Sequence, residues 1–321
     1  MNFLDERRLQ VKVARLYYEH NLTQSQIGTR LRLSRQKVQR LLQQARDAGI
    51  VQIWIQPISG VYTDMEEALE RRFGLQDVRI VETCAYEDQE IISRELGAAA
   101  ADYLLHIIRP RDKIVISNWS RAIQGMVNAL RFSRKRVAGV VVIQGLSELV
   151  YPPLGTFDPG DLTRDLAKAL GGRALLIPAP GIATDSVSRA AFCQDPLVAH
   201  VLEQARAADM AFMGVGAVGP EPTPMWEGDI VSTVELSDLV ERGAVGEINL
   251  HYFDAQGQPV SSSLDDRVLG LTLEEIRAIG RTVCVAGGSE KFAAILGVLN
   301  GHIADVLIAD HVTAQHLLKA V

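Results

Sequence analysis

Short apolar segments alternate with amphipathic segments from Val78 to the end of the chain. The apolar segments have the length of buried strands and lie at residues 78–82, 113–117, 138–144, 173–177, 209–215, 246–253, 281–286 and 305–309. Most of the segments between them carry an apolar helical face, at residues 90–108, 121–131, 161–171, 196–208, 289–300 and 311–320. Strands that alternate with helices predict an α/β fold with a doubly wound parallel sheet.

The first 56 residues differ in charge from the rest. They carry ten Lys and Arg against four Asp and Glu, a net charge of +6, whereas the remainder carries 23 against 35, a net charge of −12. A basic module on an acidic body suggests an interaction with an acidic partner. The alternative is chance clustering of charges on solvated helix faces.

The length of 321 residues favours two domains, and a composition of 47% hydrophobic residues excludes a disordered chain. The apolar segments are far shorter than a membrane span, and the charged segment Met1–Arg8 does not resemble a secretory signal. Cys84, Cys193 and Cys284 are odd in number and widely spaced, which favours reduced core thiols over disulfides or a zinc site. We therefore expect a cytoplasmic protein without a bound metal.

The basic segment has the pattern of three helices. Apolar residues from Leu9 to Tyr17 recur at helical spacing and predict a first helix at about 5–20. Thr23 and Gln26 have capping-box spacing, so a short second helix should begin at Thr23 and end near Arg32. Ser34 is an N-cap for a third helix, which Gly49 closes, and residues 51–55 alternate like a strand.

This order is that of a winged helix-turn-helix, which we place at residues 1–56. Its third helix exposes side chains that can reach base edges and phosphates. The predicted DNA-binding residues are Thr23, Gln24, Ser34, Arg35, Gln36, Lys37, Gln39 and Arg40. A small three-helix bundle with a solvated basic face is the alternative.

Residues 57–74 are expected to join the two parts. Pro57–Gly60 has the composition of a linker, and Thr63–Glu66 has the spacing of a second capping box, which would start a helix that ends at Gly74. This helix either pairs with a second copy of the chain or packs against its own body. The body itself is assigned to residues 75–321.

Two loops of the body place a cation in the first turn of a helix, in the segments Ser117–Arg121 and Gly287–Lys291. A cation there opposes the helix macrodipole at a cost of about 0.3–1 kcal/mol. The placement is explained if an anion binds at the helix N-terminus, held by free amides, hydroxyls and the cation. Alternatively, Arg121 and Lys291 extend into water or pair with carboxylates.

Other loops after predicted strands supply further candidates for a small-molecule site. Gly214 and Gly216 either permit close approach of a ligand or only form a tight turn. The carboxylates of Asp254 and Asp310 can accept hydrogen bonds from sugar hydroxyls. Asp254 can instead shape its turn, and Asp310 can instead cap the last helix. The full set of predicted effector-binding residues is Ser117, Asn118, Ser120, Arg121, Gly145, Gly214, Gly216, Asp254, Arg267, Lys291 and Asp310.

Nearly end to end, the chain resembles the SorC family of bacterial sugar-responsive transcription regulators. The resemblance is carried by the segments 22–41, 162–167, 178–180, 214–218, 243–248, 253–254, 266–268 and 285–291. It implies a winged helix-turn-helix joined to a sugar-phosphate-isomerase-like effector domain that forms dimers or tetramers. It also implies that Ser117–Arg121 and Lys291 hold phosphate. The family's usual Trp-Gly-x-x-Thr is replaced here by Trp119–Ile123, so an unphosphorylated sugar or polyol is the alternative effector.

The resemblance implies a DNA-binding regulator of a carbohydrate-use operon, whose operator binding depends on a sugar or sugar phosphate. The alternative is an isomerase or deaminase with an accessory DNA-binding head. Related deaminases carry Asp-Gly-His after the glycine loop, whereas Ala217, Val218 and Gly219 follow here. We therefore expect no enzyme activity and no cofactor. The expected partners are double-stranded operator DNA, the small effector and further copies of the chain, with no membrane.

Overall fold

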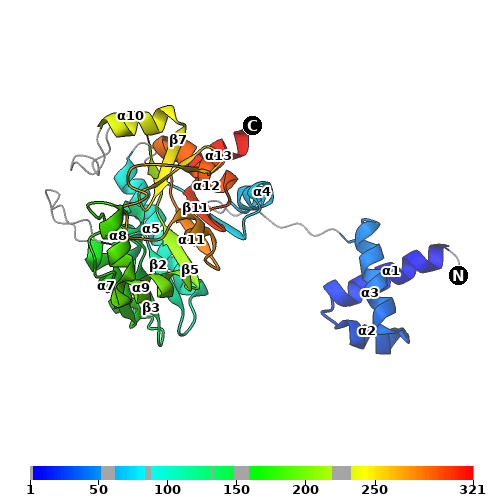
Figure 1. Cartoon of the computed structure of the whole chain (residues 1–321). Coiled ribbons are helices and arrows are strands. Elements are labelled where there is room, and N and C mark those ends of the chain that lie inside the picture. Colours follow the sequence, from blue (N-terminus) through cyan, green and yellow to red (C-terminus); the bar gives the residue numbers. More distant parts are fainter. Residues whose placement is uncertain are drawn as a thin grey trace. The chain divides into compact units, whose positions relative to one another are not determined.

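The computed structural model describes residues 3–51, 62–83, 88–131, 133–147, 159–218 and 233–320. The chain divides into two compact units, Met1–Ile58 and Ser59–Val321 (Figure 1). No helix among the described residues is long and apolar enough to cross a membrane.

The first unit contains three helices, α1 (Phe3–Tyr18), α2 (Gln24–Leu31) and α3 (Arg35–Asp47). They pack around buried apolar side chains that include Val13, Ile27 and Leu41. The expected capping box begins α2, because the Gln26 amide donates to Thr23 Oγ1 at 3.3 Å and the Thr23 amide donates to Gln26 Oε1 at 2.9 Å. Apart from Val51, the strand expected at 51–55 lies outside the described residues.

The turn between α2 and α3 explains the small residue in α2. Arg32 adopts the left-handed conformation with φ 55°, and the next amide, of Leu33, donates to the Gly28 carbonyl at 2.8 Å. A Cβ atom at Gly28 would lie 2.7 Å from the Leu33 carbonyl oxygen. The chain therefore reverses against the bare backbone of Gly28.

We expect Gly28→Ala to destabilise the first unit by about 1–3 kcal/mol, because the added methyl group must push this turn apart. Urea unfolding of the full chain, followed by hydrogen exchange of the α2 and α3 amides, measures the loss. Thr29→Ala at an exposed position of the same helix is the control. Equal stabilities of the two variants would contradict the close packing.

The second unit is built on a seven-stranded parallel sheet, which confirms the predicted fold class. Its strands are β1 (Asp77–Val81), β2 (Lys113–Ile116), β3 (Val141–Gln144), β4 (Arg173–Leu175), β5 (Met210–Met213), β10 (Thr282–Val285) and β11 (Val306–Asp310). Their order is β1-β11-β10-β5-β2-β3-β4, and all six pairings are parallel. The strand predicted at 138–144 begins three residues later than expected.

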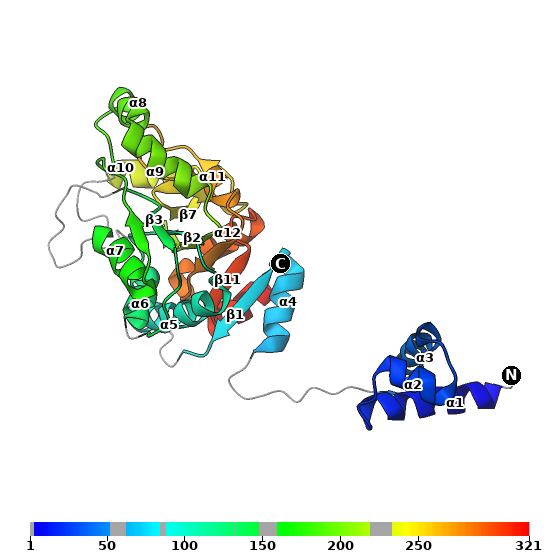
Figure 2. The ribbon, with the colours of Figure 1, turned by 90° about the horizontal axis from the view of Figure 1, so that it is seen from below.

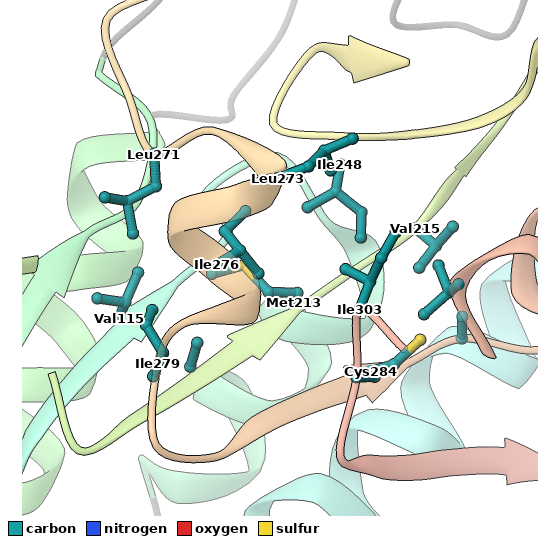
Figure 3. Close-up of a cluster of buried hydrophobic side chains, with 14 of the residues drawn as sticks. Val115, Met213, Val215, Ile248, Leu271, Leu273, Ile276, Ile279, Cys284 and Ile303 are labelled. Atoms are coloured by element: carbon teal, nitrogen blue, oxygen red, sulfur yellow. The ribbon is translucent and has the colours of Figure 1, made fainter. Parts of the chain in front are cut away.

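Helices cover both faces of this sheet, as a doubly wound fold requires (Figures 1 and 2). One face is covered by α5 (Gln89–Ile107), α6 (Arg121–Leu130) and α7 (Pro159–Leu170). The other is covered by α4 (Thr63–Phe73), α9 (Pro196–Arg206), α11 (Leu273–Arg277), α12 (Phe292–Asn300) and α13 (His311–Lys319). Figure 3 shows part of the core on this second face, to which Val115 of β2, Cys284 of β10 and Ile276 of α11 all belong.

The prediction of one strand at 246–253 was wrong. This segment forms an antiparallel hairpin of β7 (Ala244–Ile248) and β8 (His251–Asp254), because Asn249 and Leu250 adopt positive φ angles of 53° and 65° and reverse the chain. The hairpin joins β6 (Gly216–Ala217) and β9 (Pro259–Val260) in a second, four-stranded antiparallel sheet. The helices α8 (Ser186–Gln194), α10 (Thr233–Glu241) and α11 were also not predicted.

The capping box predicted at Thr63 was also wrong. The N-cap of α4 is Tyr62, without a side-chain hydrogen bond, and Thr63 is already helical. The helix ends at Gly74 as expected, in the left-handed conformation. Leu69 and Phe73 are buried in the core of the second unit, so α4 packs against its own body, one of the two arrangements expected.

Candidate functional site

The order of the strands reverses between β2 and β5: β3 and β4 follow β2 toward one edge of the sheet, and β10 and β11 follow β5 toward the other. At such a point the loops after neighbouring strands diverge, and ligands of open α/β sheets bind in the resulting crevice. The loops after β2 and β5 are held together here. The Ser117 amide donates to the Phe212 carbonyl at 3.0 Å, and a Cβ atom at Gly214 would lie 2.1 Å from Ser120 Oγ.

The tip of the β7–β8 hairpin is anchored at the same edge. Asn249 Oδ1 accepts from Ser117 Oγ at 3.1 Å, and Asn249 Nδ2 donates to the Gly145 carbonyl at 3.3 Å. The Gly145 carbonyl also accepts from the Leu271 amide at 2.9 Å. Ser117 and Gly145, both predicted site residues, therefore connect the parallel sheet to the second sheet.

Asn118 is fully buried beside this connection. Its Nδ2 atom donates to the Leu146 carbonyl at 3.0 Å, and its Oδ1 atom accepts from Thr163 Oγ1 at 3.4 Å. Both ends of the amide thus have protein partners, so Asn118 shapes the loop.

The two predicted cations lie close enough to interact. Arg121 is exposed at the start of α6, and Ser120 caps this helix by accepting from the Ile123 amide at 3.3 Å. Lys291 is half-buried at the end of a 3₁₀ turn, Ser289–Lys291, that leads into α12. Burial lowers the pKa of Lys291; the charge of Glu247 opposes this shift, and the charge of Arg121 adds to it by a smaller amount. Neither cation forms an ion pair with a carboxylate of the described ranges.

A buried carboxylate completes this cluster. Glu247 Oε2 accepts from the Leu250 amide at 2.9 Å, and a Cβ atom at Gly216 would lie 2.1 Å from Glu247 Oε1. Burial raises the pKa of Glu247, whereas the charges of Lys291 and His251 lower it. Burial also raises the pKa of the nearby Cys284 thiol to about 12, so this thiol stays neutral.

Sequence reasoning did not select Glu247 as a site residue. Its only signal was the segment 243–248, which entered the resemblance without a role for the carboxylate. The structure therefore adds Glu247 to the neighbourhood of Lys291 and explains the need for glycine at position 216.

Asp310 lies at the end of β11, where its carboxylate binds protein groups. Oδ1 accepts from the Thr313 amide at 2.8 Å, and Oδ2 accepts from the Gly288 amide at 2.8 Å and from Thr313 Oγ1 at 2.6 Å. Asp310 thus caps α13 and at the same time holds the loop that precedes Lys291.

Asp254 and Arg267 lie elsewhere. Asp254 Oδ1 accepts from the Gln256 and Gln258 amides, both at 2.9 Å, and its carbonyl packs against Gly297 of α12. Gly297 is six residues, or about 9 Å of helix, beyond Lys291. Arg267 Nε donates to the Ala183 carbonyl at 2.9 Å. The structure does not bring either residue to the two cations.

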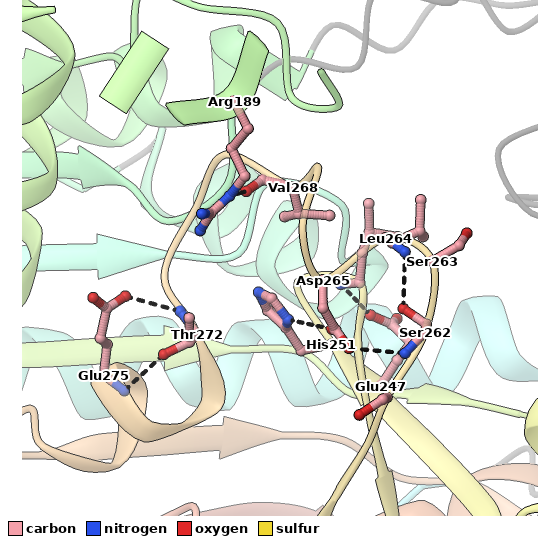
Figure 4. A network of polar contacts seen from close by, with 12 residues as sticks. Arg189, Glu247, His251, Ser262, Ser263, Leu264, Asp265, Val268, Thr272 and Glu275 are labelled. Atoms are coloured by element: carbon pink, nitrogen blue, oxygen red, sulfur yellow. Dashed lines mark hydrogen bonds and ion pairs between the residues drawn. The ribbon is translucent and has the colours of Figure 1, made fainter. Parts of the chain in front are cut away.

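A second polar network holds the segment that carries Arg267 (Figure 4). His251 Nδ1 lies 3.1 Å from Asp265 Oδ1, and Asp265 Oδ2 accepts from the Ser262 amide at 2.8 Å. Burial opposes ionisation of Asp265, but these two hydrogen bonds lower its pKa below the usual value. In Figure 4 the imidazole of His251 and the carboxylate of Glu247 point in different directions.

The first unit displays the predicted DNA-binding side chains on α3 and at the start of α2. The exposed ones are Thr23, Ser34, Arg35, Gln36, Gln39 and Arg40, whereas Gln24 and Lys37 are half-buried. A groove of about 380 Å³ is lined by Gln24, Gln36, Gln39, Arg40, Leu42, Gln43 and Arg46. Thr23 and Ser34 use their hydroxyls as helix caps.

Metal ligands are not gathered in the described part of the chain, where no group of three or more His, Cys, Asp or Glu side chains is placed to hold an ion. Cys193 is half-buried and Cys284 buried, both as free thiols, and Cys84 lies outside the described residues.

The family described as "Putative sugar-binding domain" (Sugar-bind) matches residues 60–319. The chain is 29% identical over 315 residues to the deoxyribonucleoside regulator of Bacillus subtilis strain 168, with 98% of each chain covered. It is 28% identical over 317 residues to the sorbitol operon regulator of Klebsiella pneumoniae, which covers 98% of this chain and 99% of that one.

Solved structures agree with these relationships. The full-length sorbitol operon regulator SorC from Klebsiella pneumoniae matches with a TM-score of 0.74 and 26% identity, over 98% of this chain and 99% of that one. The sugar-binding domain of the transcriptional regulator DeoR from Pseudomonas syringae pv. tomato matches with a TM-score of 0.61 and 32% identity, over 81% of this chain and all of that domain. The chain therefore belongs to the family of SorC-type transcriptional regulators with a sugar-binding domain.

Proposed function

We propose that the protein is a DNA-binding transcriptional regulator of a carbohydrate-use operon, and that a sugar or sugar phosphate at the carboxyl edge of its parallel sheet controls operator binding. The observation that carries the effector site is the placement of Arg121 after β2 and of Lys291 after β10, at the carboxyl ends of the two strands that flank β5, where the order of the strands reverses. Full-length similarity to regulators named for a sorbitol operon and for deoxyribonucleosides supports the role in transcription.

The DNA-binding part of the proposal rests on the first unit. The exposed Arg35 and Arg40 of α3 have the chemistry to read guanine edges, and Gln36 and Gln39 have the chemistry to read adenine edges. We propose that the chain acts in the cytoplasm as a dimer or tetramer. Two copies would place their α3 helices in major grooves about 34 Å apart.

The effector part rests on charge. Neither Arg121 nor Lys291 forms an ion pair within the described residues, so a bound anion would interact with both charges and would offset the cost of placing Arg121 at a helix N-terminus. Glu247 lies beside Lys291 and can accept hydrogen bonds from sugar hydroxyls. Because Gly214 and Gly216 have no side chains, their backbone can lie against Ser120 and Glu247, respectively. A sugar phosphate offers both an anionic group for the two cations and hydroxyls for Glu247.

The enzyme alternative has less support. Sugar isomerisation and deamination need a general base and a proton donor beside the carbonyl carbon. After the glycine loop, β6 carries Ala217 and is followed by Val218, neither of which can transfer a proton. Conversion of any bound sugar phosphate by the purified protein would restore the enzyme alternative.

Thermal unfolding tests the effector class, since a ligand that binds only the folded state raises the melting temperature. Suitable probes are sorbitol, sorbitol 6-phosphate, 2-deoxyribose 5-phosphate and inorganic phosphate. We expect phosphorylated probes to raise the melting temperature and the unphosphorylated sugar to have little effect. The opposite ranking would favour a polyol and exclude the proposed phosphate contact.

The pH dependence of phosphate binding should report on Lys291. Its pKa is lowered, so it loses its charge at a lower pH than an ordinary lysine, and affinity should fall as the pH rises through that value. The phosphate itself only gains negative charge over this range. Lys291→Arg keeps the cation and should remove the decline, which calorimetric titration at several pH values can measure. An equal decline in both proteins would contradict the role of Lys291.

A further inference from the structure

We propose that helix α13 relays occupancy of the effector site to helix α4, the first element of the second unit after the linker. This inference rests on the proposed function, because it concerns how the anion-binding loop communicates with the DNA-binding unit. Three sets of contacts define the relay: between the Gly287–Lys291 loop and the start of α13, between the starts of α13 and α4, and between the far ends of these two helices.

The first contact joins the loop to α13. Asp310 caps α13 through the Thr313 amide, and the same carboxylate accepts from the Gly288 amide at 2.8 Å. Gly288 has a φ of 95°, and a Cβ atom at Gly287 would lie 2.3 Å from Asp310 Oδ2. The loop therefore rests directly on the cap, and movement of one displaces the other.

The second contact joins α13 to the start of α4. His311, the first residue of α13, is buried and stacks on Tyr62 with 5.6 Å between the ring centroids and 11° between the ring planes. The Thr83 amide at the end of β1 donates to His311 Nδ1 at 3.4 Å. Tyr62 is the N-cap of α4, and its carbonyl accepts from the Met65 and Glu66 amides, both at 2.9 Å.

The third contact lies at the far ends of the two helices. Arg72 Nη1 of α4 donates to the Leu318 carbonyl of α13 at 2.8 Å, and Arg72 Nη2 also contacts the Ala320 carbonyl. The two helices are therefore tied at both ends and should shift as one body. Because the linker enters α4 at Tyr62, a shift of α13 acts on the chain that leads to the DNA-binding unit.

The charge of a bound anion would let the Gly287–Lys291 loop and the cap of α13 adopt two arrangements. The Gly288 amide donates to Asp310 Oδ2 at 2.8 Å and to Thr313 Oγ1 at 3.0 Å. A phosphate group at Lys291 competes for amides of this loop and repels the nearby carboxylate, which favours a rearranged loop and cap. Binding then biases the position of α13, as an effector must if its site is to be coupled to DNA affinity.

Tyr62→Ala and Tyr62→Phe form a matched pair that tests the relay, because only the first removes the ring stack on His311. Inorganic phosphate is the probe, and hydrogen exchange of the full chain is the measurement. In the wild type and in Tyr62→Phe, phosphate should slow exchange of the Gly288–Lys291 amides and change exchange at Met65 and Glu66 by about fivefold or more. In Tyr62→Ala the loop should still be protected, whereas the α4 amides should no longer respond.

A phosphate response at Met65 and Glu66 that persists in Tyr62→Ala, with the loop protected as in the wild type, would overturn the relay and leave the proposed function intact. Absence of loop protection in the wild type would overturn the anion site itself, and the relay with it. Melting temperatures of both variants measured alongside confirm that each is folded under the conditions of exchange.

Discussion

Lys291→Met should lower the affinity for a sugar phosphate by about 2–5 kcal/mol, or roughly 30- to 4,000-fold. Lys291 is half-buried, and its charge is disfavoured by burial and by Arg121 and only partly compensated by Glu247. A bound anion relieves these costs, so replacing the cation should cause a large loss of affinity. Methionine keeps the length of the side chain without the charge.

Isothermal titration with 2-deoxyribose 5-phosphate or sorbitol 6-phosphate measures this loss. Lys319→Met removes an equal charge from the exposed end of α13 and serves as the control. Unchanged affinity in Lys291→Met, or an equal loss in the control, would remove Lys291 from the effector site.

The variant Arg35→Ala with Arg40→Ala should lower operator affinity by about 2–6 kcal/mol, since each arginine contact to a guanine contributes about 1–3 kcal/mol. Both side chains are exposed on α3, and Arg40 lines the same groove as Gln36 and Gln39. Fluorescence anisotropy with DNA from upstream of the gene, at one fixed salt concentration, measures the loss.

Arg15→Ala is the matched control for charge on the same unit. Arg15 lies on α1, where it pairs with Glu19 at 3.3 Å and remains largely exposed. If Arg15→Ala weakened binding as much as the double variant, attraction by net charge would explain the interaction, and α3 would lose its role as the reading helix.

Most of the parallel sheet could be predicted, because its strands are short apolar segments separated by amphipathic helices. The second sheet could not, for physical reasons visible at two places. The β7–β8 turn is made by Asn249 and Leu250 in the left-handed conformation, without the glycine that usually signals such a turn. The strands β6 and β9 contain two residues each, too few to show alternation.

The candidate site could be predicted where the charge of a residue is unfavourable in its local structure. Arg121 and Lys291 stood out because cations are unfavourable at helix N-termini, and the structure brings them together. Glu247 gave no such signal, because an acidic residue within a strand pattern usually faces water, and only the packing of Gly216 against it shows its burial. Asp310 acts as a helix cap, which the sequence had left as an open alternative.

In the proposed function, a small anionic sugar at the carboxyl edge of the parallel sheet controls DNA binding by the first unit. The most direct measurement is the affinity of the full chain for DNA from upstream of its gene, with and without each sugar phosphate that raises the melting temperature. We predict a change of about 5- to 150-fold that Lys291→Met abolishes. Tight DNA binding that is unchanged by every sugar phosphate that raises the melting temperature would contradict the proposed function.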